Sequence, residues 1–269
     1  MTRKAGPCAL IVLLAVLSAG LPVRAERGRS QIEKPKIFQD SYPIVSDSDF
    51  LCSFFVLEAA ASARIEGAEA SDGMTLIGEG ELVWARGADG EDVRPGQVFA
   101  VIEPSEPTPG AKPGQGPGPI AFRRGRLRVV RLDGPIFLGR IEKACGTIRA
   151  GCLLLPYEEK APILGRDLGY NAVFKGGETV TGRLSYFRDG LVQAGPGDWI
   201  LIDIGGGQGL QAGQQLTVFS KPEGDRPPRA AANVVIVDVG LDTATVKVLS
   251  AREALHVGDL VQVKEPRGD

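Results

Sequence analysis

Short apolar runs rich in β-branched residues alternate with glycine-containing turns along most of the 269-residue chain. Such runs favour strands, because β-branched side chains fit an extended backbone and glycine adopts the positive φ angles that tight turns need. The sequence has no long segment with apolar residues at helical spacing. The pattern therefore predicts an all-β protein.

One unit of this pattern occurs twice. Residues 78–102 and residues 195–219 align without a gap, with several glycines, a glutamine and a valine at matching positions. In each copy an apolar run is followed by a glycine-rich segment, and a second apolar run begins after Gly96 or Gly213. Each unit predicts a strand, a turn and a strand. The chain is therefore predicted to be a duplication whose two units superpose strand for strand.

The second half of each repeat predicts a hairpin and a closing strand. Residues 127–141 and 233–248 alternate apolar and polar side chains around a tight turn. A glycine turn then leads into a last apolar run within residues 147–154 or 254–261. About five short strands per repeat indicate a small barrel or sandwich. The predicted fold is all-β, with two tandem duplicated small β-barrel or sandwich-like domains after a signal peptide.

These features divide the chain into six segments. They are a signal peptide (1–25), a flexible lead (26–49), a first β-repeat domain (50–157) with a Pro/Gly-rich loop (103–119), a linker (158–178), a second β-repeat domain (179–264) and a tail (265–269). The signal is inferred because Arg3 and Lys4 precede an apolar run that ends in small residues. That run is too short to span a bilayer. No membrane span is expected once the signal is removed.

The segment around residue 50 allows two kinds of structure. The apolar run of residues 50–57 predicts a strand, and the alanine-rich residues 58–64 could carry a helical turn. Ser46-Asp47-Ser48-Asp49 resembles the start of a calcium loop only superficially, because it has no glycine and glutamate at the spacing of an EF-hand. We therefore expect residues 46–49 to form a cap or a turn.

The charge of the chain argues against nucleic acid as a partner. The formal net charge is −2, and binding to phosphate backbones needs clustered Lys and Arg. One basic cluster is present, formed by Arg123, Arg124, Arg126 and Arg128. It is typical of a solvated strand, and alternatively it could contact an anionic polymer such as a teichoic acid or a lipid head group.

Candidate catalytic, cofactor-binding and metal-binding groups are weak. The glycine-rich residues 205–209 are not followed by Lys-Ser/Thr and are better explained as a hairpin turn than as a phosphate loop. His256 is the only histidine, and no nucleophile with a supporting acid can be paired with it. The chain has no C-x-x-C pair. The sequence therefore predicts no catalytic residue, no cofactor and no metal site.

Cys145 and Cys152 are close enough in sequence to form a disulfide across the last turn of the first repeat. An exported protein reaches an oxidising compartment in which such a bond is stable. The aligned residues of the second repeat, Ser250 and Asp259, have no sulfur, so the turn can also form without a bridge. Pairing of Cys52 with either cysteine is the other possibility.

The paired motifs carry a resemblance. GEGELVW with RPGQVFAVI in the first repeat, and GPGDWILID with LQAGQQLTVF in the second, resemble the C-terminal β-repeat region of bacterial secreted LysM-domain-containing proteins, over roughly residues 54–264. They are more weakly similar to the C-terminal domain of flagellar assembly protein T. The sequence contains no LysM module, so peptidoglycan binding is not carried over. The resemblance implies an exported, non-catalytic envelope protein.

The sequence thus predicts a non-enzymatic protein of the periplasm, cell envelope or extracellular space. It would act as a scaffold or binding module for an envelope protein or a cell-wall polymer such as peptidoglycan. One alternative is an accessory component of a flagellar or secretion apparatus. The other is a secreted hydrolase, which would need a cleft with titratable groups of opposed pKa values.

Overall fold

The computed structural model describes residues 41–70, 76–89, 92–105, 118–171, 173–177, 179–220, 224 and 227–264. The predicted signal peptide, residues 26–40 of the predicted lead, residues 106–117 of the Pro/Gly-rich loop and the tail lie outside the described residues. The described residues all belong to one compact unit, Asp40–Asp269, and this unit contains two β-barrels.

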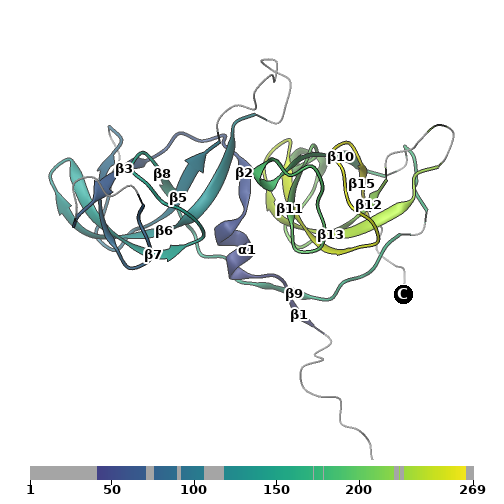
Figure 1. Ribbon diagram of the computed structural model, residues 1–269, viewed down its shortest axis with the longest axis horizontal. Coiled ribbons are helices and arrows are strands. Elements are labelled where there is room, and N and C mark those ends of the chain that lie inside the picture. Colours follow the sequence, from purple (N-terminus) through teal and green to yellow (C-terminus); the bar gives the residue numbers. More distant parts are fainter. Residues whose placement is uncertain are drawn as a thin grey trace, which may run out of the picture. The chain divides into compact units, whose positions relative to one another are not determined.

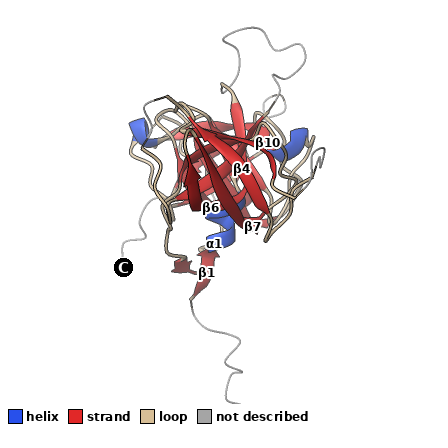
Figure 2. Cartoon of the chain, turned by 90° about the vertical axis from the view of Figure 1, so that its left-hand side faces the viewer, coloured by secondary structure: helices blue, strands red, loops and turns tan. Residues whose placement is uncertain are grey.

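The first barrel is a closed antiparallel sheet of six strands in the order β6-β5-β8-β3-β4-β7, with β7 pairing back to β6. Its strands are β3 (Ala63–Ala68), β4 (Leu82–Gly87), β5 (Val98–Pro104), β6 (Ile120–Asp133), β7 (Ile136–Ala144) and β8 (Leu153–Pro156). A short further strand, β2 (Phe54–Val56), pairs with β6 outside the ring. In Figure 2 the strands β4, β6 and β7 form the wall of this barrel that faces the viewer.

The second barrel closes in the order β10-β11-β14-β13-β12-β15. Its strands are β10 (Thr181–Phe187), β11 (Trp199–Ile202), β12 (Gln215–Phe219), β13 (Ala230–Val239), β14 (Ala244–Ala251) and β15 (Leu260–Val263), with short 3-10 turns η1 (Arg188–Gly190) and η2 (Gly206–Gln208). Each strand from β3 to β8 has a counterpart from β10 to β15 with the same neighbours. Both barrels are drawn in Figure 1. The predicted all-β fold of two tandem small barrels is confirmed.

The two barrels also share their strand register. β5 pairs with β8 so that Ala100 lies opposite Leu155, and β12 pairs with β15 so that Thr217 lies opposite Gln262. The bulge between β5 and β6 recurs at the matching place between β12 and β13. The predicted strand-for-strand match of residues 78–102 with residues 195–219 is therefore confirmed.

A four-residue turn recurs at the barrel ends. In each case the third residue is a glycine with φ between 82° and 93°, and the fourth side chain accepts a hydrogen bond from the first backbone N–H. The turns are 78–81, 94–97, 195–198, 211–214 and 256–259. Residues 149–152 form the same turn with Cys152 at the fourth position. Acids such as Glu81 and Asp198 therefore act as turn acceptors.

Each barrel encloses its own apolar core. Inward side chains of alternate strand positions, such as Phe99, Leu127 and Phe137 in the first barrel, are fully or almost fully buried. The second core likewise combines large and small residues such as Phe187, Leu216 and Val246. Burial of this apolar surface is the main stabilising term in each barrel.

The segment before the first barrel differs from the sequence prediction. Phe50, Leu51 and Cys52 belong to a helix, α1 (Asp47–Cys52), and strand β2 begins only at residue 54, so the strand predicted over residues 50–57 is partly wrong. The reason is a capping box: the Ser46 hydroxyl accepts from the Asp49 N–H at 3.2 Å, and Asp49 accepts from the Ser46 N–H at 2.8 Å. The expected cap at residues 46–49 is present.

Two segments predicted to be irregular are in fact ordered. Within the predicted lead, β1 (Tyr42–Val45) pairs with β9 (Ile163–Gly165), which lies inside the predicted linker. Conversely, the helical turn considered for residues 58–64 is absent, because this stretch bends and then enters β3. The lead and the linker thus pair with each other through backbone hydrogen bonds that no local sequence pattern specifies.

The recurring turn gives a direct stability test. Replacing Gly197 by Ala should lower the free energy of unfolding by about 1–2 kcal/mol, because Gly197 has φ 92° and an alanine is strained there. A Cβ at this position meets no atom within 4 Å, so the loss is conformational rather than steric. Urea unfolding of both proteins measures it. Gly195→Ala is the matched control, since a Cβ there is equally free and φ is not positive. An equal loss of unfolding free energy in both variants would contradict the role given to the positive φ of Gly197.

Candidate functional site

Part of the predicted linker lies along the outside of the second barrel. Residues 166–171 and 173–175, here called the strap, exchange hydrogen bonds with three outward-facing side chains, Gln215, Thr217 and Gln262. These bonds are Gln215 Nε2 to Arg166 O (2.7 Å), Leu168 N to Gln215 Oε1 (3.0 Å), Asn171 N to Thr217 Oγ1 (3.0 Å) and Lys175 N to Gln262 Oε1 (3.1 Å). Buried polar side chains require hydrogen-bond partners. The backbone of the strap supplies these partners to Gln215, Thr217 and Gln262.

Asp167 fixes the start of the strap. Its carboxylate accepts hydrogen bonds from the side chains of Asn233 and Ser250 and, at 2.8 Å, from the Gly169 N–H. Partial burial acts to raise the pKa of Asp167, but these donors and the charge of Lys264 outweigh it, so the pKa is lowered. Phe174 adds an edge contact on Phe219, with ring centroids 5.2 Å apart. The strap is thus a docked segment without strand or helix, with a turn at Gly169 (φ 72°).

The equivalent face of the first barrel carries different side chains. The register of the two barrels places Ala100 where the second has Thr217, and Leu155 where it has Gln262. Ala100 and Ile102 form a buried floor beneath partly exposed apolar residues. These residues border an open groove of about 300 Å³, lined by Phe50, Phe55, Ala100, Ile102, Arg123, Leu155, Pro156, Tyr157, Glu158 and Lys160. We take this groove as the candidate functional site.

The N-terminal segment forms one side of the groove and contacts both barrels. Strand β2 pairs with β6 of the first barrel. Two contacts reach strand β14 of the second barrel. The Phe54 carbonyl accepts from the Thr245 hydroxyl at 2.7 Å. Asp49 pairs with Lys247 at 2.7 Å. Phe50 packs in an apolar cluster with Val235 of β13. Residues 42–56 therefore join the two barrels.

A charged cluster lies at the edge of the groove. Arg123 of β6 donates to the Ser53 hydroxyl at 2.8 Å and to the carboxylate of Asp238 in β13 at 2.5 Å, and its guanidinium stacks 4.2 Å from the centre of the Phe55 ring. Lys160 is 3.5 Å from the same carboxylate. Burial acts to raise the pKa of Asp238, but the charges of Arg123 and Lys160 and the hydrogen bond from Arg123 lower it below its ordinary value.

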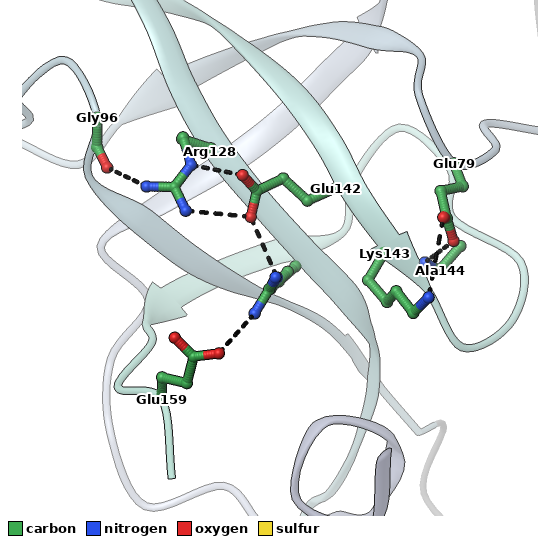
Figure 3. Close-up of polar contacts among 8 residues, drawn as sticks. Glu79, Gly96, Arg128, Glu142, Lys143, Ala144 and Glu159 are labelled. Carbon is green, nitrogen blue, oxygen red and sulfur yellow. Dashed lines mark hydrogen bonds and ion pairs between the residues drawn. The ribbon is translucent and has the colours of Figure 1, made fainter. Parts of the chain in front are cut away.

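The other arginines of the predicted basic cluster are also paired. Arg124 lies 2.7 Å from Glu103, Arg126 lies 3.1 Å from Glu142, and Arg128 donates to both Glu142 and the Gly96 carbonyl. Figure 3 shows the chain of contacts from Gly96 through Arg128 and Glu142 toward Glu159. Because each of these arginines already contacts a carboxylate, the interpretation as a solvated strand is favoured over a surface for an anionic polymer.

The disulfide joins Cys52 of α1 to Cys145, which follows β7, with a Cα–Cα distance of 5.4 Å. The predicted pairing of Cys145 with Cys152 is therefore wrong, and the alternative that involves Cys52 is the one observed. Cys152 is buried in the core of the first barrel, and this burial raises the pKa of its thiol. Cys145 instead lies outside that core, where it meets α1.

The remaining candidate groups have structural partners. The amides of Gly205, Gly206 and Gly207 donate to the Gln208 side chain, the Gly240 carbonyl and the Leu241 carbonyl, so they are not arranged as a phosphate cradle. His256 lies 3.0 Å from the Gln193 side chain. Among the described residues, no three His, Cys, Asp or Glu side chains converge as metal ligands would.

Comparison of the sequence with protein-family models and with curated proteins gives no match. The resemblance to the β-repeat region of secreted LysM-domain-containing proteins, and the weaker one to flagellar assembly protein T, therefore remain predictions. None of the helices in the described part of the chain is long and apolar enough to cross a membrane.

Acidification tests the charged cluster. A carboxyl whose pKa is lowered in the folded state contributes stability that is fully present above its unfolded pKa of about 3.9 and is lost as pH falls through the folded pKa. Asp238→Asn should therefore lower the melting temperature at pH 7. Between about pH 5 and pH 2 the melting temperature of this variant should fall less than that of the unchanged chain. Thermal unfolding across this range measures it. The exposed Asp242 provides the control; if Asp242→Asn and Asp238→Asn have the same pH profile, the role of Asp238 is wrong.

The disulfide assignment is tested by peptide mapping of the oxidised chain. A Cys52–Cys145 peptide is expected, with Cys152 modified by a thiol reagent only after unfolding, because its side chain is buried. Cys145→Ser should lower the free energy of unfolding by about 2–4 kcal/mol, since the bridge closes a long loop. Recovery of a Cys145–Cys152 peptide from the native protein would contradict the structure.

Proposed function

We propose that this chain is an exported, non-enzymatic envelope protein that binds a protein partner through its two-barrel unit. The Cys52–Cys145 disulfide supports export, since such bonds persist in oxidising compartments and are rare in the cytosol. The predicted signal peptide supports the same location. The resemblance to envelope β-repeat proteins supports a role in binding rather than catalysis.

The observation that carries the proposal is the groove of the first barrel. The matching face of the second barrel binds the strap through Thr217 and Gln262, whereas the first barrel has partly exposed Leu155 above buried Ala100 beside an open groove. Partly exposed apolar side chains that gather beside a groove, such as Phe55, Leu155 and Tyr157, are typical of an interaction surface.

The charge distribution supports a protein over an anionic wall polymer. Polymer phosphates or carboxylates are bound by clustered, available cations. In this chain, Arg123, Arg124, Arg126 and Arg128 each lie within ion-pair distance of a carboxylate. A cell-wall ligand is therefore the less favoured partner.

Fractionation of cells that express the full chain tests export. The chain is expected in the periplasmic or envelope fraction with Cys52 and Cys145 oxidised, and a matched variant without residues 2–25 should stay in the cytosol with reduced thiols. A full chain that remains cytosolic would refute the proposal.

Sedimentation with isolated peptidoglycan sacculi separates the two partner classes. The purified chain should stay in the supernatant at moderate salt, because its arginines are already paired. Salt-resistant pelleting would contradict the choice of a protein partner and would indicate that the barrels bind the wall.

A further inference from the structure

The outer wall of β11, β13 and β14 in the second barrel is the place where the N-terminal segment docks. Asp49 of α1 pairs with Lys247 of β14 at 2.7 Å. The next residue, Phe50, packs in an apolar cluster with Val235 and Val237 of β13, both fully buried. The contact is thus built on an acid that is followed directly by an aromatic residue.

The strand register identifies the equivalent wall of the first barrel as β4, β6 and β7. Lys247 of β14 lies opposite the first residue of β11, and Arg140 of β7 lies opposite the first residue of β4. Val237 is the bulged residue of β13 against β14, and Val130 is the bulged residue of β6 against β7. The two residues of the first barrel therefore hold the positions that bind the N-terminal segment in the second.

This wall of the first barrel is open to solvent. Val130 is 48% exposed, whereas Val237 at the equivalent position is fully buried. Trp84 of β4 lies on the same face and is also partly exposed. The wall is the one that faces the viewer in Figure 2. An apolar position and an aromatic ring are thus available for contact.

Two exposed arginines on this wall have no acid partner. Arg131 lies over the ring of Trp84, 5.7 Å from its centre. Neither Arg131 nor Arg140 forms an ion pair with any residue that the structure describes, whereas Arg86 and Arg128 on the same wall each pair with a glutamate. A partner that complements the wall must therefore bring its own carboxylates to the two free arginines.

The second barrel has an acid at one of these two positions. Arg131 of β6 holds the place of Asp238 in β13, because each follows the bulged valine. Asp238 pairs with Arg123 at 2.5 Å, so this position receives a base in the second barrel. In the first barrel it requires an acid. A segment that fits the wall of the first barrel therefore carries two acids.

We propose that the wall of β4, β6 and β7 binds a segment of a partner protein in which an acidic residue is followed by a large apolar residue, with a second acid nearby. Arg140 pairs with the first acid, Val130 receives the apolar side chain and Arg131 pairs with the second acid. This wall lies across the ring of strands from β5 and β8, so the inference goes beyond the groove of the proposed function.

The charges favour a protein segment over a lipid surface or a second copy. Anionic bilayers attract clusters of about 4–8 basic residues, and on the described wall Arg86 and Arg128 are already paired with acids. Two copies that met through this wall would place arginines against arginines, which is unfavourable. An acidic segment satisfies both free arginines without this repulsion.

Selection from a phage-displayed library of random peptides tests the proposal on the purified full chain with its disulfide intact. Peptides that also bind the variant with both Arg131→Glu and Arg140→Glu are removed by counter-selection. Enriched peptides should share an Asp or Glu followed by an aromatic or large aliphatic residue. Fluorescence anisotropy with a labelled enriched peptide should show about tenfold weaker binding to Arg140→Glu, because this variant replaces an attraction by a repulsion.

An exchange of charge separates recognition from a folding defect. A peptide with its first acid replaced by Lys should bind Arg140→Glu more tightly than it binds the unchanged chain. A misfolded variant cannot regain binding in this way. Val130→Asp should weaken the original peptide as well, because it removes the apolar contact.

Two controls locate the binding. Arg252→Glu in the second barrel is the matched one, because Arg252 is exposed, lies 4.4 Å from the centre of the Tyr170 ring and forms no ion pair with a described residue. It should leave the affinity unchanged, as should Leu155→Asp in the groove. Weaker binding to Leu155→Asp together with unchanged binding to Arg140→Glu would overturn the inference and leave the proposed function standing.

Three further results would overturn the inference. They are failure to enrich any peptide, pelleting with phosphatidylglycerol vesicles that is lost when both arginines are replaced by Glu, and a dimer in sedimentation velocity that is lost in the same variant. Export and oxidation of the chain in cells do not depend on this wall. Failure of the wall to bind is therefore distinguishable from failure of the proposed function.

Discussion

Closure of each sheet into a barrel is the constraint on which the rest of the structure depends. A closed antiparallel sheet pairs its strands with each other and leaves no open edge, and its inward side chains fill one core. Contacts with anything else must then use the outer faces and the loops. The strap, the N-terminal segment and the groove all lie on outer faces for this reason.

The two copies have diverged on those faces and have kept their backbones. Bulges, turn glycines and strand register recur between the barrels, because a change in any of them would disturb a closed ring of hydrogen bonds. Outward positions are free of this constraint. The second barrel uses Thr217 and Gln262 to hold its own chain, whereas the first has apolar residues at the same positions.

The sequence predicted what is local or repeated. Alternating apolar residues and the duplicated Gly-Gln turns were sufficient for two small barrels, because a two-residue period and a left-handed turn are encoded by neighbouring residues. Two long-range contacts were missed, the pairing of β1 with β9 and the ion pair of Arg123 with Asp238. The Cys52–Cys145 bridge, across 93 residues, was only the alternative to the favoured Cys145–Cys152 pairing. The groove had a sequence signal, since polar residues of the second repeat align with the apolar Ala100 and Leu155 of the first. Only the strand register shows that Ala100 and Leu155 share one face of the barrel.

The central claim is that equivalent outer faces carry a hydrogen-bonded strap in one barrel and partly exposed apolar side chains beside a groove in the other. Hydroxyl-radical footprinting of the native chain, read by mass spectrometry and normalised for the reactivity of each residue type, measures this most directly. The account predicts strong protection of Phe219 under the strap and clear modification of Leu155 and Tyr157 beside the groove. Equal protection of both faces, or greater modification of Phe219, would contradict it.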